Sequence, residues 1–216
     1  MLRAPYVIFL VVLCSIVAFS QTPDPATVTF TLDFPGSQPE HYFISVKSDG
    51  ASRYESSGKI SADSDDTDSF GLEFNASTGL RQKVFALAAK AGYFQKDIDA
   101  HHKNIAFTGK KILTYKDAKR QGQSTYNYAA QPAAQELTSL LQSLSATLEF
   151  GRRLHYDHRY QKLAIDQELK RMEEENHIAA MVEVSAIAPI LQQIIDDPSV
   201  MNVSRARAQR LLAAAP

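Results

Sequence analysis

Cysteine and tryptophan are almost missing from this chain of 216 residues, which holds one cysteine and no tryptophan. The cysteine, Cys14, lies in an apolar N-terminal segment, and Leu13 before it is larger than the small residue that a lipoprotein anchor needs. If the chain is cleaved after Ser20, the remainder contains no cysteine. Disulfide bonds, thiol chemistry and cysteine-bound zinc are then excluded.

An excess of charge of either sign is also absent. The chain has 23 lysine and arginine residues against 24 aspartate and glutamate residues, for a net charge of −1. Proteins that bind nucleic acid normally meet its phosphates with a basic surface. We therefore expect no nucleic-acid partner.

Motifs of the common enzyme classes are missing as well. The chain has no Gly-x-Ser-x-Gly, no His-Glu-x-x-His, no phosphate-binding loop and no dinucleotide fingerprint. Ser56 and Lys59 match the Ser-x-x-Lys of penicillin-recognising enzymes, but that motif begins a helix and this one follows a predicted strand. We predict a protein without enzymatic activity and without a cofactor.

The first 20 residues are typical of a secretory signal. Arg3 precedes an apolar run over Tyr6–Phe19, and Ala18 and Ser20 are small residues at the two positions that a signal peptidase reads. The run is shorter than the roughly 20 apolar residues of a membrane span. We predict a cleaved signal over residues 1–20, a secreted or periplasmic protein, and no membrane span after cleavage; an uncleaved anchor is the alternative.

Alternating apolar and polar residues predict six strands of an antiparallel sheet. They are expected over Val28–Phe34, Tyr42–Val46, Ala51–Ser56, Phe70–Phe74, Ile105–Tyr115 and Gly122–Tyr128. Asp49-Gly50 between two of them is a hairpin signal. The polar and acidic residues Ser57–Ser69 are typical of a loop.

Two helices are expected to pack on this sheet. Within Ser77–Phe94, apolar residues recur every three or four positions, and Gly92 is suited to end the helix in a left-handed conformation. A second apolar stripe begins after Pro132 and continues past Gly151 without a stop signal. The fold class predicted is therefore α+β, with an antiparallel sheet packed by two helices and followed by an all-helical C-terminal extension.

The helical extension carries more charge than the part before it. We place the sheet domain at residues 27–150 and the extension at residues 151–216, ending in a helical hairpin made of Val182–Ile195, which is interrupted at Pro189, and Val200–Ala214. Cutting the chain near Phe150 is expected to leave a folded domain that has lost its partner.

Two groups of residues are candidate metal ligands. Asp63, Asp65 and Asp68 lie in the acidic loop, but the turn glycine and the bidentate glutamate of a calcium-binding EF-hand loop are missing. His155 and His158 are three residues apart on a predicted helix and share a face, without a visible third ligand.

Two further groups are candidates for binding other molecules. A basic and aromatic patch on the extension is expected to contact an envelope protein or a second copy of the chain, through Arg152, Arg153, Tyr156, Arg159 and Tyr160. The tyrosines of the last hairpin, Tyr115, Tyr126 and Tyr128, are a candidate aromatic face for a small ligand, although cross-strand aromatic pairs are more often part of sheet packing.

Several segments together carry a resemblance. They are Ile44–Gly50 with Tyr54, Val84–Ala88 leading to Tyr93 and Phe94, and Leu113–Asp117. In this order they resemble a group of uncharacterised bacterial secreted proteins and lipoproteins. The resemblance covers about Val28–Leu148 and implies a domain of hairpin, strand, helix, hairpin and helix; it supplies no catalytic residue.

The function predicted is that of an exported, non-enzymatic envelope protein that acts as a protein-interaction or structural module. A metal-binding sensor or hydrolase using His155, His158 and the acidic loop is the first alternative. A small-ligand carrier using the tyrosine hairpin is the second.

Overall fold

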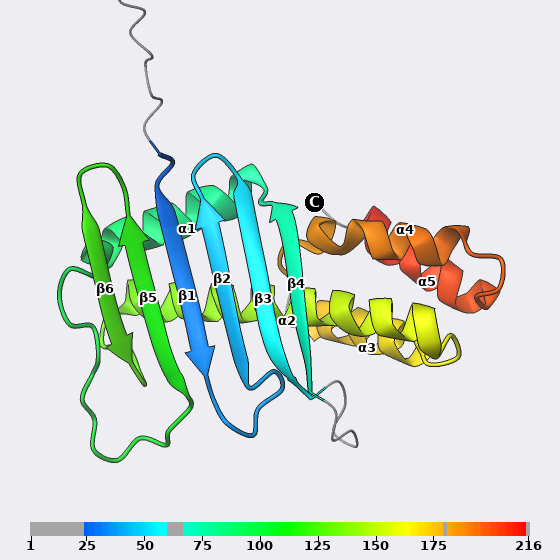
Figure 1. Cartoon of the computed structure of the whole chain (residues 1–216), viewed down its shortest axis with the longest axis horizontal. Coiled ribbons are helices and arrows are strands. Elements are labelled where there is room, and N and C mark those ends of the chain that lie inside the picture. Colours follow the sequence, from blue (N-terminus) through cyan, green and yellow to red (C-terminus); the bar gives the residue numbers. More distant parts are fainter. Residues whose placement is uncertain (1–23, 60–66, 179–180, 215–216) are drawn as a thin grey trace, which may run out of the picture.

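Figure 1 shows the computed structural model of the chain, which describes residues 24–59, 67–178 and 181–214. The predicted signal at residues 1–20 and the candidate ligands Asp63 and Asp65 lie outside these ranges. The described residues form one antiparallel sheet of six strands and five α-helices, which confirms the α+β prediction.

The strand order in the sheet is β4-β3-β2-β1-β5-β6. The strands are β1 (Thr27–Asp33), β2 (His41–Lys47), β3 (Ala51–Lys59), β4 (Thr67–Asn75), β5 (Lys110–Lys116) and β6 (Gln121–Tyr126). The helices are α1 (Thr78–Lys90), α2 (Pro132–Tyr160), α3 (Ile165–Ile178), α4 (Ala188–Asp196) and α5 (Asn202–Ala213), with short 3-10 turns η1 (Gly92–Phe94) and η2 (Val184–Ile187). The first four strands form a meander, and α1 then carries the chain to the other side of β1.

Helices α1 and α2 cover one face of the sheet, as Figure 1 shows, and the other face is uncovered. The alternation of side chains along the strands explains this. In β1, Val28, Phe30 and Leu32 are buried under the helices, whereas the threonines between them lie on the uncovered face. The sheet therefore needs only one layer of helices to bury its apolar side chains.

The hairpin predicted at Asp49-Gly50 is confirmed, since it joins β2 to β3 with Gly50 at a φ of 104°. The predicted loop Ser57–Ser69 is wrong at both ends, because β3 continues to Lys59 and β4 begins at Thr67. The strands extend here through backbone pairing, with Gly58 opposite Asp68. Pairing of this kind leaves no apolar alternation in the sequence.

Two other boundaries differ from the prediction. Strand β5 begins at Lys110 and not at Ile105, because Gly109 has a φ of 98° and turns the chain out of the strand. The interruption predicted at Pro189 falls slightly earlier, where η2 ends at Ile187 and α4 begins at Ala188, and Pro189 lies in the first turn of α4, where its missing N–H costs no hydrogen bond.

Helix α1 ends as expected near Gly92, which has a φ of 67°. Tyr93 and Phe94 also adopt left-handed backbone conformations, which the sequence did not indicate. Phe94 is fully buried, and a Cβ on Gly122 of β6 would lie 2.1 Å from the carbonyl oxygen of Tyr93. The close approach of this turn to the sheet thus requires a glycine at 122.

Helix α2 runs without interruption across the predicted domain boundary at residue 150. Phe150 and Leu154 are both buried, and a Cβ on Gly151 would lie 2.5 Å from Cγ2 of Ile187 in η2. The division into 27–150 and 151–216 therefore cuts through the middle of a packed helix. A chain ending at Phe150 would lose this packing, which argues against the expectation that such a fragment folds independently.

The second half of α2 joins α3, α4 and α5 in a helical part that extends past β4, on the right of Figure 1. Helix α3 returns along α2, and α5 lies against both α3 and α4. Among the described residues, none of the helices is both long and apolar enough to cross a membrane.

Candidate interaction surface

Two turns meet at the end of the helical part that is farthest from the sheet (Figure 1): residues 161–164 between α2 and α3, and residues 197–201 between α4 and α5. Asp197 joins them. Its Oδ2 lies 3.0 Å from Nε2 of His158 and accepts a hydrogen bond from Nζ of Lys162 at 2.6 Å. Hydrogen bonds from Lys162 first, and then from the hydroxyl and backbone N–H of Ser199, hold the pKa of Asp197 well below its usual range, so the carboxylate stays charged.

Four exposed apolar side chains gather on or beside these turns: Tyr160, Leu163, Met201 and Val203. We call them the distal surface. Leu163 is 81% exposed and Tyr160 is 62% exposed. A single exposed leucine is ordinary, but apolar side chains concentrated on one part of a surface mark sites of interaction.

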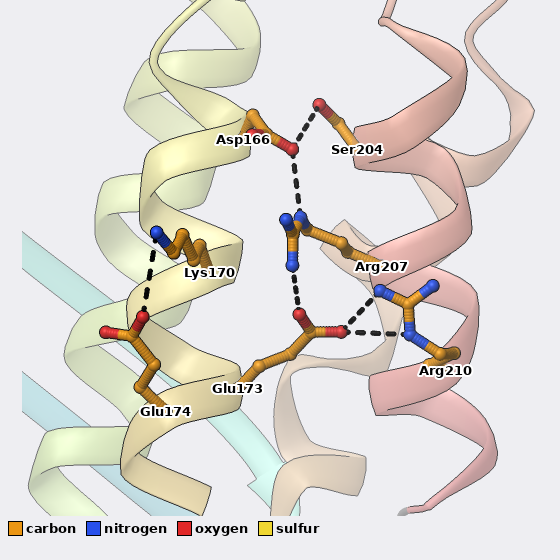
Figure 2. Close-up of polar contacts among 7 residues, drawn as sticks. All are labelled: Asp166, Lys170, Glu173, Glu174, Ser204, Arg207 and Arg210. Carbon is orange, nitrogen blue, oxygen red and sulfur yellow. Dashed lines mark hydrogen bonds and ion pairs between the residues drawn. The ribbon is translucent and has the colours of Figure 1, made fainter.

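A cluster of ion pairs between α3 and α5 holds the distal surface in place. Figure 2 shows Arg207 of α5 between two carboxylates of α3, with Nε donating to Asp166 at 3.0 Å and the guanidinium also paired with Glu173. Arg210 also pairs with Glu173, with its Nη2 donating to Oε1 at 2.8 Å. An isolated exposed pair contributes little to stability, but partly buried charges that share partners fix the geometry of two helices more firmly.

The opposite end of the helical part is attached to the sheet domain through Glu183. Its buried carboxylate accepts hydrogen bonds from the backbone N–H of Ser77 at 2.7 Å and from the Ser77 hydroxyl at 2.8 Å. The same Ser77 Oγ accepts from the N–H of Leu80 and caps α1. The helical part is therefore fixed to the start of α1 as well as through α2.

A buried polar network joins α2 to the sheet, and the sequence analysis missed it. Glu149 Oε1 accepts hydrogen bonds from the hydroxyls of Tyr54 at 2.8 Å and Ser56 at 2.6 Å, and its Oε2 accepts from Nε of Arg152 at 2.8 Å. Tyr54 also lies 3.0 Å from Oγ of Ser145. Two features of the sequence could have indicated this network. Ser56 occupies an inward position of a strand, and Glu149 lies beside the leucine stripe of α2.

The predicted basic patch does not form one surface. Arg152 is only 6% exposed and belongs to the buried network, so it cannot contact a partner. Arg153 is largely buried and paired with Glu168 of α3. Tyr156, Arg159 and Tyr160 remain accessible, with the rings of Tyr156 and Tyr160 5.1 Å apart and the guanidinium of Arg159 5.2 Å from the Tyr160 ring.

The metal candidates in the described residues lie on two elements, His155 and His158 on α2 and Asp68 on β4. His155 is exposed, whereas His158 is engaged with Asp197, and Asp68 lies in the exposed end of β4. Within the ranges that the structure describes, no three His, Cys, Asp or Glu side chains are grouped so that they could hold a metal ion. The pair His155 and His158 thus gains no third ligand from these residues.

The tyrosine hairpin does not form an open aromatic face. Tyr115 and Tyr126 are buried under the helices, and the Tyr126 hydroxyl is hydrogen-bonded to Thr138 of α2. Only Tyr128 is exposed. The burial of Tyr115 and Tyr126 supports the interpretation of these tyrosines as part of the sheet packing.

On the two turns that Asp197 joins, the hydroxyl of Ser199 lies 2.5 Å from Nζ of Lys162, a spacing at which a lysine could serve as the base for a serine nucleophile. The Ser199 hydroxyl donates to Oδ1 of Asp197 at 2.6 Å, and the Ser199 backbone N–H donates to the same atom at 2.8 Å. This is the bonding of a turn closed by an aspartate side chain. Lys162 is engaged with the Asp197 carboxylate, and an ammonium in an ion pair is a poor base.

No model of a known protein family matches the chain, and no curated protein matches it either. The resemblance to uncharacterised bacterial secreted proteins and lipoproteins therefore stays a prediction.

Proposed function

We propose that this protein is an exported, non-enzymatic interaction module that binds another protein through the distal surface. The observation that carries the proposal is the gathering of Tyr160, Leu163, Met201 and Val203 on two turns that Asp197 joins. Export is proposed from the N-terminal signal pattern at residues 1–20.

A protein partner fits this surface better than a small molecule does. Small ligands are normally held in concave sites that cover most of their area. The distal surface instead lies at the far end of the projecting helices (Figure 1), and its four exposed apolar side chains are accompanied in the sequence by charged residues such as Arg159 and Lys162. Protein interfaces usually combine apolar and aromatic side chains with polar and charged groups in this way.

The fixed geometry of the helical part supports the same proposal. A surface that is already ordered loses little conformational freedom when it binds, so more of the contact energy remains as affinity. The Glu183–Ser77 contact and the Arg207 ion pairs supply this order at the two ends of the helical part.

Capture of partners from native envelope extract tests the proposal. The bait is the chain from Gln21, which retains every described residue, and the variant carries Leu163→Asp with Val203→Asp. We expect the variant to retain at least ten-fold less of any specific partner, because each aspartate places a charge in an apolar contact. Both positions are exposed, so the melting temperature should stay within a few degrees.

The matched control is Ile178→Asp, at the other end of α3, where the side chain is 88% exposed. Sedimentation of the purified chain shows separately whether the partner is a second copy. Equal capture by the distal variant and the control, with no change in oligomeric state, would contradict the proposal.

A further inference from the structure

A second exposed apolar feature lies on the loop before β5, which we call the apolar loop (residues 101–110). Ile105 and Phe107 project from it, and Phe107 is 59% exposed. Tyr128, which follows β6, is exposed beside it. The loop holds His101, His102 and Lys103, Lys110 follows as the first residue of β5, and residues 101–110 contain no acidic residue, while Asp97 and Asp99 contact His101 and Asp33 lies opposite Lys110 in the sheet.

The structure holds this loop in a defined shape from both sides of Phe107. The side chain of Asn127 donates from Nδ2 to the carbonyl of Ala106 at 3.1 Å and accepts at Oδ1 from the N–H of Thr108 at 2.9 Å. Phe107 itself makes one ring contact, edge-on to Phe34 at 5.9 Å. The hydrogen bonds thus fix the backbone on either side of an aromatic ring that stays largely in water.

A buried lysine anchors the base of the loop. Lys111 is only 4% exposed, and its ammonium donates to the carbonyls of Thr108 at 2.9 Å, Gly109 at 3.3 Å and Asn127 at 3.0 Å. Removing a lysine from water is costly unless its protons are hydrogen-bonded. All of these acceptors belong to the loop or to Asn127, so the buried ammonium of Lys111 stabilises the conformation of this loop.

The start of the loop is fixed in the same way. Asp99 accepts from the N–H of His101 at 2.8 Å and from the N–H of Asn127 at 3.0 Å, and the His101 ring lies 2.7 Å from Asp97. The exposure of Ile105 and Phe107 is therefore a property of an ordered loop. A loop free to collapse would cover these two side chains at low cost.

We propose that the apolar loop docks this protein on the surface of an anionic lipid bilayer. Phe107 and Ile105 enter the boundary between headgroups and acyl chains, and Tyr128 lies at the headgroup level, where an aromatic ring with a hydroxyl is favoured. Lys103 and Lys110 stand on either side of the apolar pair and meet the lipid phosphates. The proposal is independent of the distal surface and of any protein partner.

The charge pattern favours a bilayer over a protein as the occupant. The apolar contact is small and consists of a few side chains on a narrow loop, whereas a stable protein interface needs a broad complementary area. A bilayer accepts such a projection without a matching shape, and it supplies negative charge for the two exposed lysines, since the carboxylates beside the loop, Asp97, Asp99 and Asp33, are already bonded to His101, Asn127 and His41.

Co-sedimentation of the chain from Gln21 with lipid vesicles tests this docking. Vesicles of phosphatidylcholine alone are compared with vesicles that contain phosphatidylglycerol as well. We expect binding to the anionic vesicles at least ten-fold tighter than to the neutral ones. Ile105→Ser with Phe107→Ser should lower that binding at least ten-fold, and Lys103→Gln or Lys110→Gln about five-fold each.

Ile178→Ser is the matched control, because it removes an exposed apolar side chain that belongs to neither the apolar loop nor the distal surface and should leave vesicle binding unchanged. The serine variants should keep the circular dichroism spectrum and melting temperature of the unaltered chain. Equal vesicle binding by the loop variant and the unaltered chain would overturn the proposal. Failure of the unaltered chain to bind anionic vesicles, or loss of a dimer in the loop variant in place of a loss of lipid binding, would overturn it too.

Discussion

Glu149 is the residue through which the sheet and α2 are held in register. It receives the hydroxyls of Tyr54 and Ser56 from β3 and the guanidinium of Arg152 from the next turn of its own helix. Arg152 also donates to the carbonyl of Lys59 at 3.3 Å, while its Nη1 has no hydrogen-bond partner in the described part of the chain. The buried guanidinium of Arg152 therefore depends on the Glu149 carboxylate for its counter-charge.

Glu149→Ala is accordingly expected to destabilise the protein by about 3 kcal/mol, since it leaves Arg152 buried without a counter-charge. The free energy of unfolding in urea measures this. Glu149→Leu combined with Arg152→Met should recover most of the loss, because the pair is then replaced by apolar groups of similar size. A single-variant loss below 1 kcal/mol would show that the network contributes little.

Asp157 near the end of α2 should make stability depend on pH. Desolvation first, and then the charge of Glu168, raise its pKa from 3.8 to about 6, while Arg153 acts in the opposite direction. Because the folded state binds this proton more tightly than the unfolded state, the contribution of Asp157 is most favourable below pH 4 and is lost as the pH rises through 6.

We therefore expect Asp157→Asn to stabilise the protein at pH 7.5 by about 1 kcal/mol, reduced from the full shift because the side chain is partly exposed. The gain should shrink towards pH 4. Melting temperatures of both chains across this range measure the effect, and a gain that does not change with pH would be inconsistent with it.

Individual residues were the hardest features to predict from the sequence. Arg152 stands among basic and aromatic residues that suggest an exposed patch, and only its position opposite Ser56 and Lys59 makes it a buried partner of Glu149. Tyr126 likewise alternates with polar residues on both sides, which does not reveal which face the helices cover. The role of Arg152 depends on contacts between segments about 90 residues apart, and that of Tyr126 on its contact with Thr138 of the following helix.

At the scale of elements, Gly151 explains how α2 and η2 approach each other. A glycine within a helix costs about 1 kcal/mol relative to alanine, so its presence in α2 requires a compensating contact. That contact is Ile187, whose Cγ2 would lie 2.5 Å from an added Cβ.

Gly151→Ala should therefore destabilise the protein by about 1–3 kcal/mol despite the better helix propensity of alanine. The double variant Gly151→Ala with Ile187→Ala makes room for the methyl group. It should be less destabilised than the sum of the two single variants, as measured by urea unfolding of all four chains. Strict additivity of the two changes would mean that the two residues do not interfere.

Most of the elements follow from patterns that the sequence contains. The periods of β1 and β2, the Asp49-Gly50 turn and the leucine stripe of α2 each depend on neighbouring residues, and the structure has them where they were expected. The ends of β3 and β4 were missed because polar residues such as Ser57 and Asp68 pair through their backbones alone. The sequence correctly indicated that α2 continues through Gly151. A helix that continues there also crosses the predicted domain boundary at residue 150, and the prediction did not take this into account.

On the scale of the whole molecule, the helical part is an outgrowth of α2 that is fixed to the sheet domain at two sites. One is the contact of Glu183 with Ser77, and the other is the continuous α2 with its Glu149–Arg152 pair. Sequence periodicity predicted the class of each half and their order. It could not indicate that the halves share a core, because the contacts that join them are few and far apart along the chain.

This arrangement leaves two exposed apolar surfaces, the distal surface and the apolar loop, each held by its own hydrogen bonds. Apolar residues occur throughout the sequence, and nothing in the local pattern distinguishes Leu163, which is exposed, from Leu154, which is buried. Only the packing of the helices distinguishes them. The candidate functional surfaces could therefore be located from the structure and not from the sequence.

The most direct test of the distal surface is the capture experiment with a photo-crosslinking amino acid in place of Leu163. Crosslinking is carried out in intact cells that produce the full chain, and the same amino acid in place of Ile178 serves as the control. We predict a discrete adduct of higher mass from position 163 that is absent from position 178 and lost when Val203→Asp is added. The same adducts from both positions, or none from position 163, would contradict the claim that this end of the molecule binds a protein.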